Sequence, residues 1–147
     1  MRTPSQTVGP FFAFALCDRP ANELVSPDDP GADHLSGQVL DGADEPVDDA
    51  LVEVWHPDAG FGRCGTDADG RFSFVVPRAV GHLEVMVFAR GLLKQVITRV
   101  YLAEGPDEVL EAVPPERRET LLARPIDGGL RFDVRLQGER ETAFFAL

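Results

Sequence analysis

The chain of 147 residues has few of the residues on which catalytic and metal sites are commonly built: two cysteines, three histidines and one tyrosine. The histidines His34, His56 and His82 form no H-x-H or H-x-x-x-H pair, so their spacing does not indicate a metal site. The sequence also contains no glycine-rich phosphate loop, no G-x-S-x-G and no C-x-x-C. These absences disfavour a P-loop nucleotidase, a hydrolase with a nucleophile elbow and a dithiol oxidoreductase.

The two cysteines, Cys17 and Cys64, lie far apart in a chain that can build a substantial core without a disulfide, so we expect free thiols in a reducing compartment. Cys64 has no histidine close to it in the sequence, which favours a structural thiol over a reactive one. The apolar stretch from Val8 to Cys17 lacks a cationic run, an A-x-A cleavage site and the length of a membrane span. We therefore expect a cytoplasmic protein.

Basic residues are scarce relative to acidic ones, and the formal net charge is -11. This balance disfavours binding to nucleic acid or to an anionic membrane surface, both of which attract basic proteins. It is otherwise compatible with simple solubility and indicates no particular partner. The apolar fraction of 44% over this length predicts one domain with one core.

Residues 1–35 contain five prolines and little periodicity, which predicts an extended N-terminal arm. The arm nevertheless carries several large apolar side chains that would form a sticky patch if they were exposed. We therefore expect it to pack on this domain or on a partner subunit. The apolar residues concerned are Phe11, Phe12, Phe14 and Leu16.

Residues 36–147 read as one β-rich domain, in which short apolar or alternating segments are separated by turn-forming residues. Such regular spacing favours an all-β sandwich. Prolines at the start of short helical patterns predict helical turns within residues 106–124. The predicted strands fall near residues 38–40, 51–55, 63–66, 71–76, 82–89, 96–102, 130–136 and 142–145.

A few individual side chains stand out. Trp55 and Tyr101 lie in apolar strands and are predicted to be core residues. His82 stands at the head of a strand, where it is either hydrogen-bonded at the sheet end or a ligand. Arg90 follows an apolar strand and precedes Gly91, so it lies where that strand enters a loop. Its planar guanidinium could bind a carboxylate there, the alternative being an ordinary surface arginine.

Longer blocks of the sequence carry a family resemblance. VEVWHPDAG and GTDADGRFSF resemble the sandwich core of intradiol ring-cleaving dioxygenases, which transthyretin-like and carboxypeptidase-regulatory modules share. Four more blocks resemble the alpha-type chains of the heteromeric protocatechuate 3,4-dioxygenases in this family, and they occur in the family's order. These blocks are TPSQTVGPF at 3–11, VFARGLLKQVITRVYL at 87–102, RRETLLAR at 117–124 and RFDVRLQGERETAFFAL at 131–147.

The resemblance implies an intradiol dioxygenase β-sandwich that acts only as one subunit of a hetero-oligomer. In this family the beta-type chain binds Fe(3+) through two tyrosines and two histidines, and cleaves protocatechuate with O2 to 3-carboxy-cis,cis-muconate. Here the first ligand histidine falls at His82, the second falls at Glu84, and Tyr101 is the only tyrosine. We therefore expect this chain to bind no metal, to be inactive alone, and to depend on an iron-bearing beta-type partner.

The resemblance also implies that the substrate pocket lies at the alpha–beta interface. Thr7, Gly9 and Pro10 are expected to line it, and Arg90 is expected to project toward the substrate carboxylate. Phe11 stands where many relatives have tyrosine, which removes a hydroxyl group. The chain is also short for this family, so we expect a more open pocket rim.

Two other interpretations remain. A non-catalytic transthyretin-like or carboxypeptidase-regulatory-like binding module explains the sandwich core, but not the blocks near the two ends. A self-sufficient catechol or hydroxyquinol dioxygenase would bind its own iron and needs tyrosines that this chain does not have.

Overall fold

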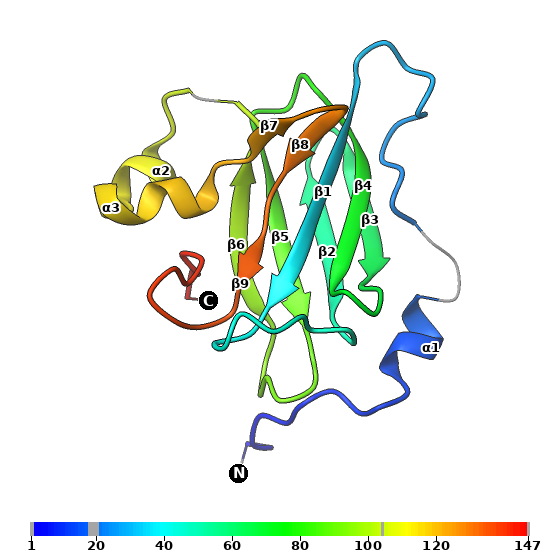
Figure 1. Ribbon diagram of the computed structural model, residues 1–147, viewed down its shortest axis with the longest axis vertical. Helices are drawn as coiled ribbons and strands as arrows, with labels where there is room; N and C mark the ends of the chain where they lie inside the picture. The colour runs from blue at the N-terminus through cyan, green and yellow to red at the C-terminus, as the bar shows by residue number, and fades with distance from the viewer. Residues whose placement is uncertain (1, 18–20, 104, 147) are drawn as a thin grey trace.

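Two β-sheets packed face to face form the body of the computed structural model, which describes residues 2–17, 21–103 and 105–146 (Figure 1). One sheet has the strand order β4-β1-β8-β7, with β9 paired to the end of β1, and the other has the order β3-β2-β5-β6. The predicted all-β sandwich is confirmed. The strands within the described residues are β1 Ala32–Leu40, β2 Leu51–His56, β3 Gly60–Gly65, β4 Arg71–Pro77, β5 His82–Phe88, β6 Val96–Tyr101, β7 Arg124–Ile126, β8 Gly129–Arg131 and β9 Val134–Arg135.

Alternation along each strand places one row of side chains between the sheets. In β5, Leu83, Val85 and Val87 are buried, whereas the residues between them are only partly covered. Burying each such side chain stabilises the fold by about 1.5–3 kcal/mol. The other buried members of this core are Leu35, Val39, Ala50, Val52, Val54, Phe72, Phe74, Val76, Val80, Ala89, Val100, Phe132 and Val134.

The segment predicted as a single strand at 130–136 is divided into β8 and β9. β8 pairs with β1 at Leu35 and Ser36, whereas β9 pairs with it at Val39 and Leu40. The backbone between these pairings passes very close to Gly37, where an added Cβ would lie 1.8 Å from the carbonyl oxygen of Phe132. Only glycine permits that approach, and the crossing interrupts regular pairing.

Helical turns form within residues 106–124, as predicted: α2 spans Glu108–Ala112, α3 spans Pro115–Arg118, and a 3-10 turn covers Glu119–Leu121. The side chain of Asp107 caps α2 by accepting hydrogen bonds from the backbone N–H groups of Val109 and Leu110. The turns lie beside β6 (Figure 1), and with it they bury a small second cluster that includes Tyr101. In the described part of the chain, no helix has the length and apolarity needed to cross a membrane.

The N-terminal arm is not wholly extended, because it contains the short helix α1, Phe12–Leu16. Beyond this helix the arm runs along its own domain: Ala21 pairs with Arg63 of β3, and the Leu24 N–H donates to the Val75 carbonyl of β4. Strand β1 already begins at Ala32, inside the range expected for the arm. The side chain of Phe14 lies outside the described part of the structure.

Two expectations about the strands were wrong. Trp55 is 44% exposed, because Val52 and Val54 take the core side of β2 and the alternation turns Trp55 outward. Residues 142–145 form no strand. They are instead anchored by their backbone: the buried Thr98 hydroxyl donates to the Ala143 carbonyl at 2.8 Å. The Phe145 N–H donates to the Ile97 carbonyl, also at 2.8 Å.

Candidate functional site

The N-terminal arm meets the loop between β5 and β6, at the lower end of the sandwich in Figure 1. The backbone N–H of Gly91 donates a hydrogen bond of 2.9 Å to the hydroxyl oxygen of Thr7, which is 84 positions earlier in the chain. Gly91 has a φ of +93°, a conformation that residues with a Cβ rarely adopt. The turn after β5 therefore presents its N–H to the arm, and Thr7 comes to lie beside Arg90.

Arg90 stands at this junction with its side chain 57% exposed. Its Nε donates to the carboxylate of Asp49, which lies just before β2. This contact, together with the charge of Asp49, raises the pKa of Arg90. Because Asp49 holds the guanidinium through Nε, it fixes the direction of the side chain near its base. A guanidinium offers five N–H donors, so others remain to engage a ligand.

The remaining predicted pocket residues, Gly9 and Pro10, follow Thr7 on the exposed part of the arm. The Gly9 carbonyl accepts a hydrogen bond of 3.2 Å from Phe12, at the start of α1. An added Cβ at Gly9 would meet no atom within 4 Å, so the backbone there is open to approach. The structure thus brings Thr7 and Arg90 together, and places Gly9 and Pro10 on the same short segment. Such a site suits a carboxylate-bearing ligand.

A second candidate region is the outer face of the β3-β2-β5-β6 sheet, the face turned away from β1. Trp55 lies directly opposite Phe61 of β3 and Glu84 of β5 in the register. Trp55 and Phe61 are 44% and 47% exposed. The next row across the sheet contains Met86 and Ile97, which are partly exposed, together with the ion pair of Glu53 and Arg63. This outer face therefore combines exposed aromatic rings with apolar side chains, a composition typical of protein interfaces.

The positions that the family resemblance assigns to iron ligands lie on the same face. Glu84 faces Arg99 of β6 and accepts a hydrogen bond of 2.8 Å from its Nε, and the Nη2 of Arg99 lies 2.7 Å from the same carboxylate oxygen as an ion pair. The Nη1 of Arg99 is also 3.6 Å from the Asp107 carboxylate. A guanidinium thus lies between two carboxylates, where it supplies the positive charge that a metal ion would otherwise bring.

The aromatic groups beside Arg99 are held in neutral forms. The Tyr101 hydroxyl donates to Asp107 at 2.8 Å. Burial raises the pKa of Tyr101, which disfavours the tyrosinate form. Burial also lowers the pKa of His82, and the charge of Arg99 adds to this effect. His82 lies 3.9 Å from the Asp107 carboxylate, and its ring is 6.0 Å from that of His56.

This arrangement does not fit a ferric ion. Arg99 would repel a metal cation, and its carboxylate partner Glu84 stands where a second histidine would be needed. Tyr101 keeps its proton through the bond to Asp107. Among residues 2–17, 21–103 and 105–146, there is no group of three or more histidine, cysteine, aspartate or glutamate side chains that could hold a metal.

Sequence reasoning singled out Arg90 but did not foresee its contact with Asp49 or the contacts of Arg99 and Asp107. Asp49 lies 41 positions from Arg90, and Arg99 meets Glu84 only through the β5–β6 register. One signal was available for Asp107, since an aspartate just before a short helical pattern is a favoured N-cap.

Comparison with known proteins agrees with this geometry, although no family model matches the chain. The chain is 38% identical to the protocatechuate 3,4-dioxygenase alpha chain of Burkholderia cepacia, covering 98% of this chain and 96% of the relative. It is 36% identical to the alpha chain from Pseudomonas putida, with coverages of 97% and 95%. The beta chain from Burkholderia cepacia is 27% identical, over 74% of this chain and 65% of the relative.

The alignments with the two alpha chains extend over 192 residues, so these relatives contain segments that this shorter chain does not have. Among solved structures, the dioxygenase domain of a carbohydrate-binding fusion protein from Streptomyces sp. SirexAA-E superposes with a TM-score of 0.59. It is 26% identical, and the match covers 97% of this chain and all of that one. Hydroxyquinol 1,2-dioxygenase from Pseudomonas putida has a TM-score of 0.57 at 19% identity, over 90% of this chain and 66% of that one, which shows a shared fold.

The similarity to the alpha chains spans almost the whole of both proteins and exceeds the similarity to the beta chain. The fold agrees with it. The chain belongs to the intradiol ring-cleaving dioxygenase family, among the protocatechuate 3,4-dioxygenase alpha chains.

Proposed function

We propose that this chain is the non-iron-binding subunit of a heteromeric dioxygenase that cleaves protocatechuate with O2 to 3-carboxy-cis,cis-muconate. Both oxygen atoms enter the product, so the reaction needs no external reductant. The chain supplies part of the substrate pocket, and a beta-type partner supplies Fe(3+), which activates the substrate for ring opening. The similarity to two alpha chains over almost the whole of both proteins carries the subunit role, and the contact of Thr7 with Gly91, which holds the arm beside Arg90, supports the pocket.

Arg90 binds the substrate carboxylate in this proposal. The substrate is an anion and the chain is strongly acidic, so a cation at the pocket is needed to offset long-range repulsion. Asp49 directs Arg90 through Nε, and the exposed arm at Gly9 and Pro10 forms the adjacent wall. No proton transfer is assigned to these residues, because their contribution is to hold the carboxylate and to limit the access of water.

The beta-type partner packs on the outer face defined above and on the arm. Trp55 and Phe61 provide exposed aromatic area of the kind that anchors stable interfaces. The arm adds Leu16, which is also exposed. The relatives are named as alpha and beta chains of one enzyme, which supports a hetero-oligomer. Two free cysteines suit a reducing compartment, and we place the complex in the cytoplasm.

The test is co-expression of this chain with a beta-type chain encoded beside it, followed by gel filtration and an oxygen-uptake assay with protocatechuate. We expect the two chains to elute together as a coloured, oxygen-consuming complex, whereas this chain alone is colourless and inactive. Arg90→Ala in the complex should raise KM for protocatechuate roughly tenfold with little change in kcat, because it removes binding common to ground and transition states.

Catechol serves as the matched control ligand, because it has the two hydroxyl groups of the substrate but no carboxylate. Its binding to the Arg90→Ala complex should equal its binding to the unchanged complex. Failure of the two chains to elute together would contradict the subunit assignment and favour a stand-alone binding module. A KM for protocatechuate that does not respond to Arg90→Ala would leave the subunit role intact but remove Arg90 from the pocket.

A further inference from the structure

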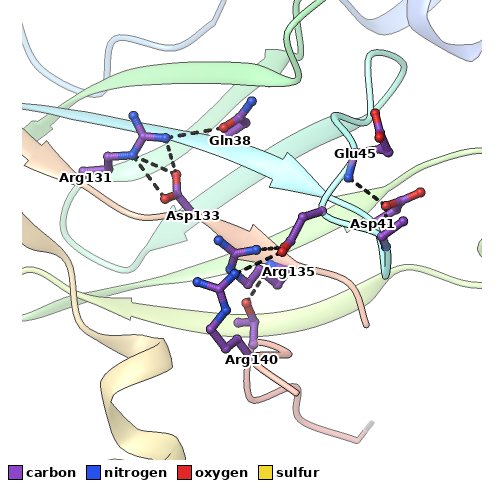
Figure 2. Close-up of polar contacts among 10 residues, drawn as sticks. Gln38, Asp41, Glu45, Arg131, Asp133, Arg135 and Arg140 are labelled. Carbon is purple, nitrogen blue, oxygen red and sulfur yellow. Dashed lines mark hydrogen bonds and ion pairs between the residues drawn. The ribbon is translucent and has the colours of Figure 1, made fainter. Parts of the chain in front are cut away.

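A cavity of about 410 Å³ lies on the opposite side of the molecule from the outer face, between the helical turns and the ends of β8 and β9. Five arginines contribute to its lining, although the chain as a whole has a net charge of -11. Figure 2 shows three of them, with Arg135 and Arg140 turned toward each other and Arg131 farther along the same sheet. The five are Arg117, Arg124, Arg131, Arg135 and Arg140.

Carboxylates balance these guanidiniums unevenly. Arg131 has its own partner in Asp133, at 2.9 Å. Arg135 and Arg140, in contrast, share the single carboxylate of Asp44, so this trio keeps one net positive charge. Three further acidic residues line the cavity and are exposed, as are Arg124 and Arg140, so water screens the charges of both signs there. The three acidic residues are Glu116, Glu119 and Glu139.

Arg135 is the less exposed of the two arginines that share Asp44, and its charge is the less favourably placed. The side chain of Arg135 is only 20% exposed, and its pKa is lowered first by burial and then by the charge of Arg140. An additional negative charge beside Arg135 would offset both effects. Asp44, the carboxylate that the two arginines share, lies in the turn after β1 with a φ of +63°, a conformation in which aspartate is enriched.

Arg117 also lines this cavity, and one of its N–H groups has no acceptor in the described part of the chain. Its Nη2 donates to the carbonyl of Glu141 at 2.9 Å, whereas the Glu141 carboxylate is 3.9 Å away. Its Nε is buried and has no hydrogen-bond acceptor among the described residues. A buried N–H without an acceptor normally costs about 1–3 kcal/mol, so such groups are rare unless a ligand or water completes them.

We propose that this cavity is a binding site for a small multivalent oxyanion, either a polycarboxylate or a phosphate. Arg135 and Arg140 bind one anionic group, and Arg117 closes the other side. Guanidiniums suit both ligand types because their paired N–H groups match two oxygens of a carboxylate or phosphate. The residues that line the cavity include neither Arg90 nor Thr7, and the proposal does not depend on the proposed function.

Isothermal titration calorimetry of the full chain with citrate and with inorganic phosphate, at constant ionic strength, tests the proposal. Acetate serves as the monovalent control. We expect saturable binding of at least one multivalent anion and none of acetate. The ligand that binds identifies the chemistry of the site: citrate indicates a carboxylate site, and phosphate indicates a phosphate site.

Two substitutions should act in opposite directions. Arg135→Gln removes a cation and should weaken binding about tenfold. Asp44→Asn removes the competing carboxylate and should tighten binding several-fold, and it gives a reading even if Arg135→Gln folds poorly. Arg78→Gln is the matched control, because Arg78 pairs with Asp33 in an exposed ion pair elsewhere on the sandwich.

The proposal fails if neither citrate nor phosphate binds the unchanged chain saturably. It also fails if Asp44→Asn weakens binding as Arg135→Gln does, because the arginines would then be only a structural cluster that fixes the C-terminal segment. An equal effect of Arg78→Gln would show general charge screening and would overturn the site as well.

Discussion

At the scale of single residues, Asp49 determines how Arg90 can act. A carboxylate that binds Nε orients the side chain, but it also cancels much of the charge that a substrate anion needs. These two effects can be separated, because asparagine keeps an oxygen that accepts the Nε hydrogen bond and has no charge.

We therefore expect Asp49→Asn, in the complex with the beta-type partner, to lower KM for protocatechuate roughly threefold at unchanged kcat. The measurement is steady-state oxygen uptake at low and high ionic strength, since the gain should shrink as salt screens the charge. Asp48→Asn is the comparison: it removes an equal charge that acts on Arg90 only at longer range, so its effect should be smaller. A rise in KM with Asp49→Asn would mean that the charged pair itself holds Arg90 in place.

The sequence predicts some residues well and others poorly for physical reasons. Arg90 was placed correctly at the end of an apolar strand, and Tyr101 was placed correctly in a buried position with one hydroxyl partner. Trp55 was misplaced, because a large aromatic residue in an apolar strand suggests the core whichever way the strand alternates. Only the pairing of β2 with its neighbours fixes which face is buried.

At the scale of elements, the start of β5, the end of β6 and the cap of α2 share one polar cluster. His82, Tyr101 and Asp107 come from three elements. Tyr101 donates a hydrogen bond to Asp107, its ring lies 5.5 Å from that of His82, and His82 Nδ1 is 3.9 Å from the Asp107 carboxylate. Their pKa values are shifted by burial and by the cap hydrogen bonds. The stability of this corner should therefore change with pH.

The two titrations act over different pH ranges. The pKa of His82 lies below its usual 6.5, so the unfolded chain binds a proton there more readily than the folded chain does. Stability should then fall as the pH drops below about 6.5. The pKa of Asp107 lies below its usual 3.8, mainly because of the hydrogen bond from Leu110, so its contribution is present above that value and is lost only at lower pH.

Thermal unfolding between pH 8 and pH 3 measures both effects. We expect the melting temperature to decline in two stages, and His82→Gln should abolish the first stage while leaving the second. His34→Gln is the matched control, because His34 is exposed. The melting temperature of this variant should change with pH as that of the unchanged chain does. A first stage that survives in His82→Gln would place its cause elsewhere.

Elements were predictable where local pattern and tertiary structure agree. The helical turns within 106–124 follow from prolines at helix starts and from the Asp107 cap. The strand expected at 142–145 did not form. The backbone of this segment makes separate hydrogen bonds to the Thr98 hydroxyl and the Ile97 carbonyl, and it does not pair regularly with a neighbouring strand. The division of 130–136 depends on the contact of Gly37 with Phe132, which no local pattern reveals.

At the scale of the whole molecule, an acidic chain carries exposed aromatic rings on one face and an arginine-lined cavity on the other. The arginines of the cavity come from residues 117–140, and neither their convergence nor the sharing of Asp44 could be read from the sequence. The separation of the two faces makes them independently testable.

Phe61→Ser should weaken association with the beta-type partner at least tenfold without lowering the melting temperature of the free chain, because Phe61 is exposed and outside the core. Analytical ultracentrifugation of mixed chains gives the affinity. Ile126→Ser is the matched control, since Ile126 is an apolar side chain of similar exposure that lies on the other sheet. Equal association of the Phe61→Ser and unchanged chains would remove the outer face from the interface.

Trp55 is the single tryptophan of this chain, and it stands on that outer face with almost half of its surface in water. An indole in this position is a natural reporter. Incorporation of 5-fluorotryptophan into this chain alone gives one ¹⁹F resonance, whose chemical shift depends on whether solvent or protein surrounds the ring. Titration with an unlabelled partner would then follow assembly through the ¹⁹F chemical shift of a residue within the proposed contact. It needs no attached dye, and the other subunit gives no signal.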